Sequence, residues 1–405
     1  MSVPSSSTQS VDPGFKLIWI LALLSTFAPL AIDMYLPSLP SIGEELEASP
    51  AQVQLTLSAF LIGFSLGQLF YGPLSDRFGR RPILLSGISL FSLTSALCAL
   101  SWDIESLTLF RFLHALGGGA AIVVARAVVR DRFDTNQSAK VLSTILLCTA
   151  LAPLAAPIIG GYLLEHGGWR TIFWVLTGFG VFSFLVVLLS LEESNPASRR
   201  DGSSLLKAFV RYKEVLGNPR VIGYMFASGF IYAGMFAYII GTPFVYIEYF
   251  GVAPENYGYL FGLNIIAIVI ASRINVRFVS QIGAKTMMGR SIMVSCIAGL
   301  ALGLVGWLNL GSEGWGIWLI VVPLLFFLGP ISIVGANGVA LACGEYPKAA
   351  GAVAALCGAT QFGLGSLSGV LLGLLNNGTP LGMCVVIAGC GALGVIAFSL
   401  MSKTE

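Results

Sequence analysis

Two long apolar runs of the chain are joined by the charged turn Gly72-Pro-Leu-Ser-Asp76-Arg77-Phe-Gly79-Arg80-Arg81. The runs cover about residues 50–72 and 82–101. Each supplies the roughly 20 apolar residues that a helix needs to cross a bilayer core about 30 Å thick. Charged side chains are costly among lipid tails. The turn therefore lies outside the membrane, and the two runs are expected to form a pair of membrane-spanning helices.

The same alternation continues through the whole chain. Of its 405 residues, 56% are hydrophobic and only 10% are charged, whereas soluble domains carry about 25% charged residues. We therefore predict an all-α polytopic membrane protein with twelve transmembrane helices in two pseudo-symmetric six-helix halves. The helices are expected near residues 15–37, 50–72, 82–101, 104–130, 138–165, 169–191, 219–241, 255–280, 286–309, 314–342, 348–375 and 379–402.

A weak internal repeat supports this division of the chain. At an offset of 204 residues, the turn around Gly79 falls on Gln281-Ile-Gly283-Ala284-Lys285. Parallel repeats of this kind place the substrate site between the halves, near the middle of the membrane. The expected parts are a cytoplasmic N-terminal tail (1–14), a first half (15–191), a cytoplasmic linker (192–218) and a second half (219–402).

Basic residues gather in alternate loops. Loops on one side hold nearly all of them, while the opposite loops hold mainly acidic residues and Arg170. Because basic loops stay in the cytoplasm, we predict a multi-pass protein of the bacterial inner (plasma) membrane with both termini cytoplasmic.

Several functions are disfavoured by what the sequence lacks. The net charge of +2 is too small to indicate nucleic-acid binding. There are two histidines and seven cysteines without paired spacing, so we predict neither a metal site nor catalytic residues. No phosphate-binding GxxxxGK[ST] loop is present. We expect no enzyme activity and no cofactor, with the proton gradient as the energy source.

The charged turn is the first candidate site. Gly72 and Gly79 permit a tight bend, and Asp76 can accept hydrogen bonds from the N–H groups of a helix N-terminus. The basic residues of the turn can pair with acids such as Asp131; they are Arg77, Arg80 and Arg81. The alternative interpretation is a basic loop that only fixes the topology.

Two ionisable residues lie within membrane spans and form the second candidate site. Asp33 lies about 27 Å along the first helix, and Arg111 lies about 9 Å inside the fourth. Because these helices run in opposite directions, both side chains are expected in the outer part of the membrane, where they could meet. A carboxylate in such a place can bind protons and substrate in competition. Arg126, near the other end of the fourth helix, is expected to extend toward the membrane surface or to pair with an acid.

The fifth helix contains the pattern Pro153-Leu-Ala-Ala-Pro157-Ile-Ile-Gly160-Gly161. Its prolines remove backbone hydrogen bonds, and its small residues let a neighbouring helix approach closely. Ordinary packing of small residues remains an alternative explanation.

Four motifs together resemble the drug:proton antiporter branch of the major facilitator superfamily, most closely the bicyclomycin-resistance (Bcr/CflA-type) subfamily. They are the charged turn, the segment from Leu107 to Gly117, the fifth-helix pattern, and Asp33-Met-Tyr35-Leu-Pro37-Ser-Leu-Pro40. The resemblance implies proton-coupled efflux of bicyclomycin- or chloramphenicol-like drugs. It also implies a cytoplasmic gate at the turn, proton coupling at Arg111, and an antiporter motif in the fifth helix.

The resemblance does not identify the residues that line the substrate site. Aromatic residues of both halves are candidates to line it, with bundle packing as the alternative; they are Tyr35, Tyr232, Phe236 and Tyr238. We expect a monomer in the lipid bilayer whose partners are small-molecule drugs and protons. A proton-coupled importer or exporter of a small metabolite is the alternative function, while a membrane-embedded enzyme and a channel are disfavoured.

Overall fold

The computed structural model describes residues 15–133, 135–200, 205–310 and 314–402. Within these ranges all regular structure is helical and no strand occurs, which confirms the predicted all-α fold. Eleven helical segments of the described chain are long and apolar enough to cross a membrane. In addition to these eleven, the described chain contains the long helix α7 (Thr135–Gly167). The N-terminal tail predicted over residues 1–14 lies outside the described residues.

The first half of the molecule runs from residue 15 to residue 190. Its helices are α1 (Phe15–Ser25), α2 (Phe27–Asp33), η1 (Leu36–Ser38), α3 (Leu39–Glu45), α4 (Pro50–Phe78), α5 (Arg80–Ala99), α6 (Ile104–Arg132), α7 and α8 (Trp169–Ser190).

The second half follows a connecting segment that contains η2 (Ala197–Arg199) and the amphipathic helix α9 (Leu205–Val215). Its helices are α10 (Pro219–Pro243), the π-helical η3 (Phe244–Tyr249), α11 (Pro254–Ile282), α12 (Ala284–Trp307), η4 (Gly314–Gly316), α13 (Ile317–Leu328), α14 (Ile331–Glu345), η5 (Pro347–Ala349), α15 (Ala350–Leu374) and α16 (Leu381–Ser402).

Two expected spans are broken, contrary to the sequence prediction. The first span is interrupted at Thr26, between α1 and α2. Its helix ends at Asp33, within the motif expected to end it, and the chain continues through η1 into α3, where Pro37 and Pro40 cannot donate backbone hydrogen bonds. The tenth divides at Gly329 and Pro330 for the same reason. The segments around Thr26 and around Gly329 contain no charged residue, so hydropathy alone did not reveal these breaks.

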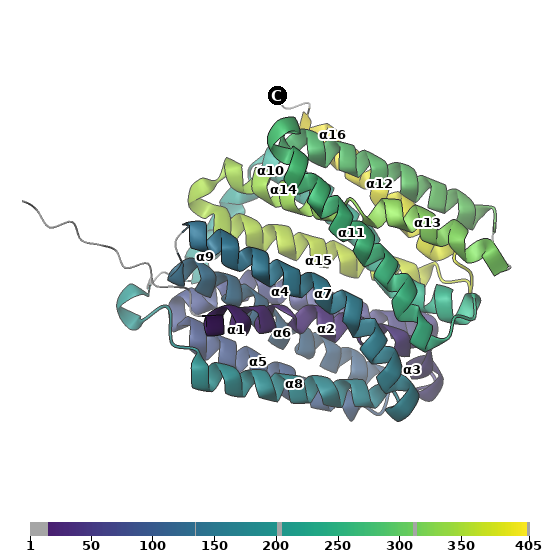
Figure 1. Ribbon diagram of the computed structural model, residues 1–405, viewed down its shortest axis with the longest axis horizontal. Helices are drawn as coiled ribbons and strands as arrows, with labels where there is room; N and C mark the ends of the chain where they lie inside the picture. Colours follow the sequence, from purple (N-terminus) through teal and green to yellow (C-terminus); the bar gives the residue numbers. More distant parts are fainter. Residues whose placement is uncertain (1–14, 134, 201–204, 311–313, 403–405) are drawn as a thin grey trace, which may run out of the picture.

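The helices form two layers, with the first half below and the second half above in Figure 1. We name the two ends of the bundle by helices. The α9 end holds α9 and the turn at Gly79, and the α3 end holds α3 and η3. The glycines at 79 and 283 each end one helix and begin the next with a positive φ, of 101° and 89°. Only glycine adopts this conformation readily, so the repeat seen in sequence has a shared backbone geometry.

Two helix pairs join the halves. Along α4 and α15, the Ser65 hydroxyl donates to the Ala359 carbonyl (2.7 Å) and the Ser366 hydroxyl to the Ser58 carbonyl (2.8 Å). The other pair is α7 and α11, which lie together at the α3 end and separate toward the α9 end (Figure 1).

Candidate functional site

A cavity of about 520 Å³ lies between the two halves. Side chains of α2, α4, α6 and α7 line it from the first half, and side chains of α10, α11, α13, α14 and α15 line it from the second. Its lining is mainly apolar but includes Asp33, Arg126 and Asn264. A solute in this cavity would contact both halves at once, as alternating access requires.

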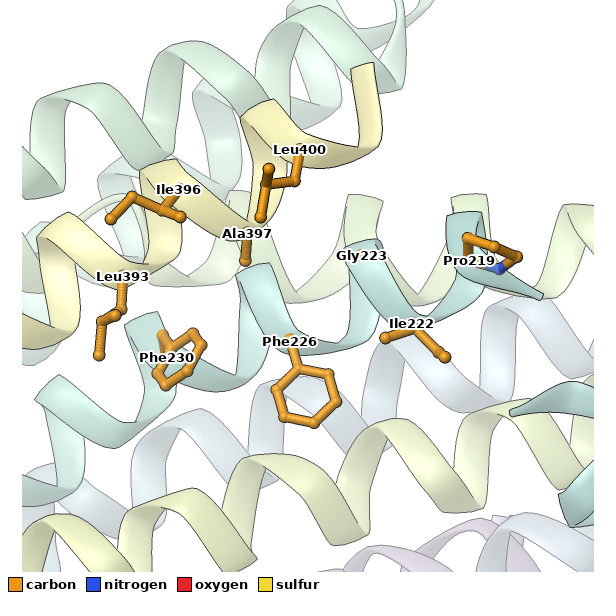
Figure 2. A pocket seen from close by; sticks show the side chains of 9 residues that line it. All are labelled: Pro219, Ile222, Gly223, Phe226, Phe230, Leu393, Ile396, Ala397 and Leu400. Carbon is orange, nitrogen blue, oxygen red and sulfur yellow. The ribbon is translucent and has the colours of Figure 1, made fainter. Parts of the chain in front are cut away.

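A second hollow lies between α10 and α16 and has a different character. Figure 2 shows the side chains that line it, among them Phe226 and Phe230 from α10 and Ile396 and Leu400 from α16. All the residues that line this groove of about 420 Å³ are apolar or glycine, and none ionises. We therefore place the candidate transport site in the central cavity and not in this groove.

Asp33 is the last residue of α2 and is only 4% exposed. Its carboxylate makes no ion pair or hydrogen bond with any described residue. An unpaired acid within a membrane protein is costly and indicates a functional site. The break after α2 thus presents an unpaired carboxylate to the cavity between the halves.

Arg111 is fully buried in the first half, beside α2. Its Nη1 donates to the carbonyl of Ala31 at 3.1 Å, and the guanidinium lies 4.4 Å from the Tyr35 ring centre and 4.3 Å from that of Phe60. Contacts with aromatic faces partly compensate its charge. The expected direct contact with Asp33 is absent, since no ion pair joins the two described side chains. Arg111 instead holds the main chain two residues before Asp33.

Only three of the four candidate aromatic residues line the central cavity. Tyr232, Phe236 and Tyr238 of α10 line the cavity. Tyr35 does not line it. Its buried hydroxyl bonds the Thr56 hydroxyl (2.8 Å), and its ring covers Arg111. Tyr35 therefore packs around the arginine, as the packing alternative expected.

The fifth-helix pattern lies in α7, where it closes the α3 end of the cavity. A Cβ at Gly160 would overlap the main-chain oxygen of Met34, and one at Gly161 would lie 3.0 Å from the carbonyl oxygen of Pro254. Pro153 lines the cavity, and α7 continues through both Pro153 and Pro157. The small residues thus bring α7 against α2 and α11, as the sequence predicted for a neighbouring helix.

The charged turn forms a compact ionic cluster at the α9 end. Arg80 is buried and pairs with Asp76 at 2.6 Å and with Asp131 at 2.8 Å. The predicted partnership with Asp131 is therefore present. Gly79 provides the bend, whereas Gly72 lies inside α4, so its predicted role in a turn is wrong.

Other residues of the turn differ in their surroundings. Arg81 donates to the Leu188 carbonyl (2.6 Å), and exposed Arg77 lies over the Phe78 ring. The N–H groups that begin α5 are bonded by Glu193 and not by Asp76. Glu193 accepts from the backbone of Arg80 (2.9 Å) and of Arg81 (3.1 Å). All these partners belong to the first half or to the segment directly after α8, so the described cluster does not link the halves by ion pairs.

The sequence of the chain matches a known protein family over most of its length. The model of the Major Facilitator Superfamily matches residues 21–370. The chain belongs to this superfamily. It is a multi-span membrane transporter and not an enzyme, because its relatives and structural neighbours are transporters.

Individual proteins of the superfamily are similar to this chain over different shares of its length. A bicyclomycin resistance protein homolog from Haemophilus influenzae is 34% identical, with 96% of each chain covered. An uncharacterized MFS-type transporter, YdgK of Bacillus subtilis, is 36% identical over 96% of this chain and 95% of its own length. The multidrug resistance protein MdtL of Escherichia coli is 38% identical over 46% of this chain and 50% of its own. These matches confirm the predicted resemblance to the bicyclomycin-resistance subfamily.

Solved structures confirm the fold of this major facilitator transporter. A D-xylose-proton symporter superposes with a TM-score of 0.75 at 14% identity, covering 96% of this chain and 97% of the other. The nucleoside transporter NupG superposes with a TM-score of 0.74 at 16% identity, covering 96% and 100%. At such identities the likeness concerns architecture alone.

Three residues of the transporter's sites were missed or misjudged from the sequence. Asn264, 1% exposed, lines the cavity; a polar amide inside an apolar span was the available signal. Arg126 lines the cavity as well and makes no ion pair with a described residue, so the expected pairing is absent. Glu193 gave no such signal, because it lies 113 residues from Arg80 in a polar stretch.

Replacing Glu193 with glutamine is expected to destabilise the ionic cluster of the charged turn. The carboxylate bonds two backbone N–H groups at the positive end of α5, and loss of such a cap costs about 0.5–2 kcal/mol. The matched control is Glu192→Gln, because Glu192 is exposed and pairs only at 3.4 Å with Arg132. Thermal unfolding of the purified protein measures both. A larger loss of stability in Glu192→Gln would contradict this assignment.

Proposed function

We propose that this transporter exports small drug-like molecules, of bicyclomycin or chloramphenicol type, across a bacterial inner membrane in exchange for protons. The observation that carries the proposal is the unpaired, buried Asp33 at a cavity shared by both halves. A carboxylate in that position can release its proton only when the surroundings or a bound solute favour its charge. Proton and solute then compete for one site, which couples their movements.

The names of the relatives support the drug class. Both the bicyclomycin resistance protein homolog and MdtL are named for resistance. The transporter's cavity, apolar with a few polar groups, suits drug-sized molecules. The gradient of protons would serve as the energy source, with no cofactor, and a monomer would suffice because one chain contains both halves.

The proposed orientation places the α9 end in the cytoplasm. That end carries the basic cluster of the turn, and basic loops remain on the cytoplasmic side. The small residues of α7 would then seal the outer side, and the cavity would be reached from the cytoplasmic side. Drug would enter there, and protonation of Asp33 from outside would follow when the halves rock to the other state.

Resistance and vesicle transport test the proposal together. A host that lacks its own exporters should become more resistant to bicyclomycin or chloramphenicol when it expresses the chain. Inverted vesicles with an acid interior should accumulate the same drug, and a proton uncoupler should abolish the accumulation. Inward movement of a metabolite together with protons, without drug resistance, would favour the importer alternative.

A further inference from the structure

The central cavity carries two opposite charges that do not neutralise each other. Among the described residues that line it, Asp33 is the acid and Arg126 is the base. Neither forms an ion pair with a described residue. Uncompensated charge inside a membrane protein is expensive, and it persists where a bound solute or ion supplies the missing partner.

The two charges stand at different depths. Arg111 and Arg126 are 15 residues apart on α6, which corresponds to about 22 Å along a helix axis. Arg111 touches the carbonyl of Ala31, beside Asp33. Arg126 therefore lies about four turns nearer the α9 end than Asp33. The cavity is positive toward its α9 end and negative toward its α3 end.

Donor groups gather at the positive end. The hydroxyl of Tyr232, which also lines the cavity, has no hydrogen bond to a described residue. Gly335 of α14 makes room for it, since a Cβ there would overlap that hydroxyl. A guanidinium offers only donors, and a phenol can donate beside it. Together Arg126 and Tyr232 suit a carboxylate or another strong acceptor.

Acceptor groups gather at the negative end. The amide nitrogen of Asn264 is used in hydrogen bonds to the Tyr238 hydroxyl (2.9 Å) and the Leu260 carbonyl (3.3 Å). Its Oδ1 is buried and has no partner among the described residues. This oxygen and the carboxylate of Asp33 both belong to residues of the cavity lining. They suit a cationic or hydrogen-bond-donating group of a solute.

We propose that the cavity also binds elongated, dipolar solutes, with an anionic group bound by Arg126 and Tyr232 and a cationic or donor group bound by Asp33 and Asn264. This inference rests on the proposed export function and adds a class of dipolar solutes to its substrates. A simple α-amino acid is too short to reach both ends, because its two charges are attached to the same carbon. A rigid aromatic frame with charges at opposite ends instead holds its two charges apart, as this arrangement requires.

Norfloxacin provides a direct probe, because its carboxylate and its piperazine nitrogen stand at opposite ends of a rigid aromatic frame. Its methyl ester lacks the negative charge, and its N-acetyl derivative lacks the positive one. Binding of all three to the purified full chain, without a proton gradient, is measured by fluorescence polarisation. The wild-type protein is expected to bind norfloxacin most tightly.

Arg126→Gln is expected to weaken norfloxacin binding by about tenfold to a hundredfold, as loss of a charged hydrogen bond implies. Binding of the methyl ester should change little. The matched control is Arg130→Gln, one turn further along α6 and outside the cavity lining, which should bind all three probes like the wild type. Asn264→Leu should reduce the preference for norfloxacin over the N-acetyl derivative.

Two results would overturn the inference. One is a wild-type protein that binds the acid and its methyl ester equally, or binds neither. The other is an Arg126→Gln variant that weakens both probes to the same degree, which would indicate a structural role. A different result is expected if the inference is right but the proposed export function is wrong. Norfloxacin would still bind selectively, but inverted vesicles with an acid interior would accumulate no drug.

Discussion

Asp33→Asn is expected to lose all acid-driven drug accumulation in inverted vesicles. Asparagine keeps the size of the side chain but cannot bind or release a proton, and no neighbouring carboxylate replaces it in the described cavity lining. Exchange of labelled for unlabelled chloramphenicol needs no net proton movement, so this activity should persist. The combination of lost accumulation and retained exchange is the signature of lost coupling.

Controls separate this loss from a folding defect. Asp33→Glu retains an ionisable group and should recover part of the accumulation. Asp103→Asn changes a half-buried helix cap whose hydrogen bonds from Ser106 hold the pKa of the Asp103 carboxyl below its usual range. It should leave accumulation intact. Undiminished active export by Asp33→Asn would refute the proton-coupling assignment.

Gly160→Ala is expected to destabilise the transporter and to stop transport. The new methyl group would meet the main-chain oxygen of Met34 and lie 2.8 Å from its carbonyl carbon. The atoms that it would meet belong to the main chain of Met34, directly after α2, so no side-chain rotation relieves the overlap. Overpacking of this kind costs about 1–3 kcal/mol, and α7 would have to move away from the segment that follows Asp33.

Gly178→Ala is the matched control for this substitution. Gly178 lies inside α8, and a Cβ there meets nothing within 4 Å. Alanine favours helix over glycine by up to about 1 kcal/mol, so this variant should be as stable as the wild type or more stable. Melting temperature and vesicle transport measure both variants. A fully active Gly160→Ala protein would show that the α7 contact with Met34 is dispensable.

Much of the fold was predictable because the membrane limits what a chain can do. Runs of apolar residues between charged loops located every span, and the offset of 204 residues found the paired turns at Gly79 and Gly283. The breaks at Thr26 and at Gly329 were not predicted. These breaks interrupt the backbone hydrogen bonding of the helix without interrupting the run of apolar residues. The length of an apolar run predicts one continuous helix and does not reveal such a break.

The depth of the site residues in the membrane was predictable from the sequence, but the direction in which their side chains point was not. Counting residues along α2 and α6 placed Asp33 and Arg111 at similar depth, yet it did not show that the arginine turns toward Tyr35 and Phe60. The pair of Arg80 and Asp131 was found because both lie in loops at the same end of the bundle. Contacts with the segment after α8, such as that of Glu193, depend on tertiary packing that no local pattern encodes.

The hydrogen bond from Arg111 to Ala31 has a consequence for genetic studies of this transporter. Its acceptor is a main-chain carbonyl, which every amino acid supplies. A mutational scan should therefore find position 111 intolerant while position 31 accepts other small residues. For the same reason, residue covariation among relatives should show no link between these two positions. The contact would be invisible to statistics built on side-chain identity, and a backbone ester at position 31 would be needed to reveal it.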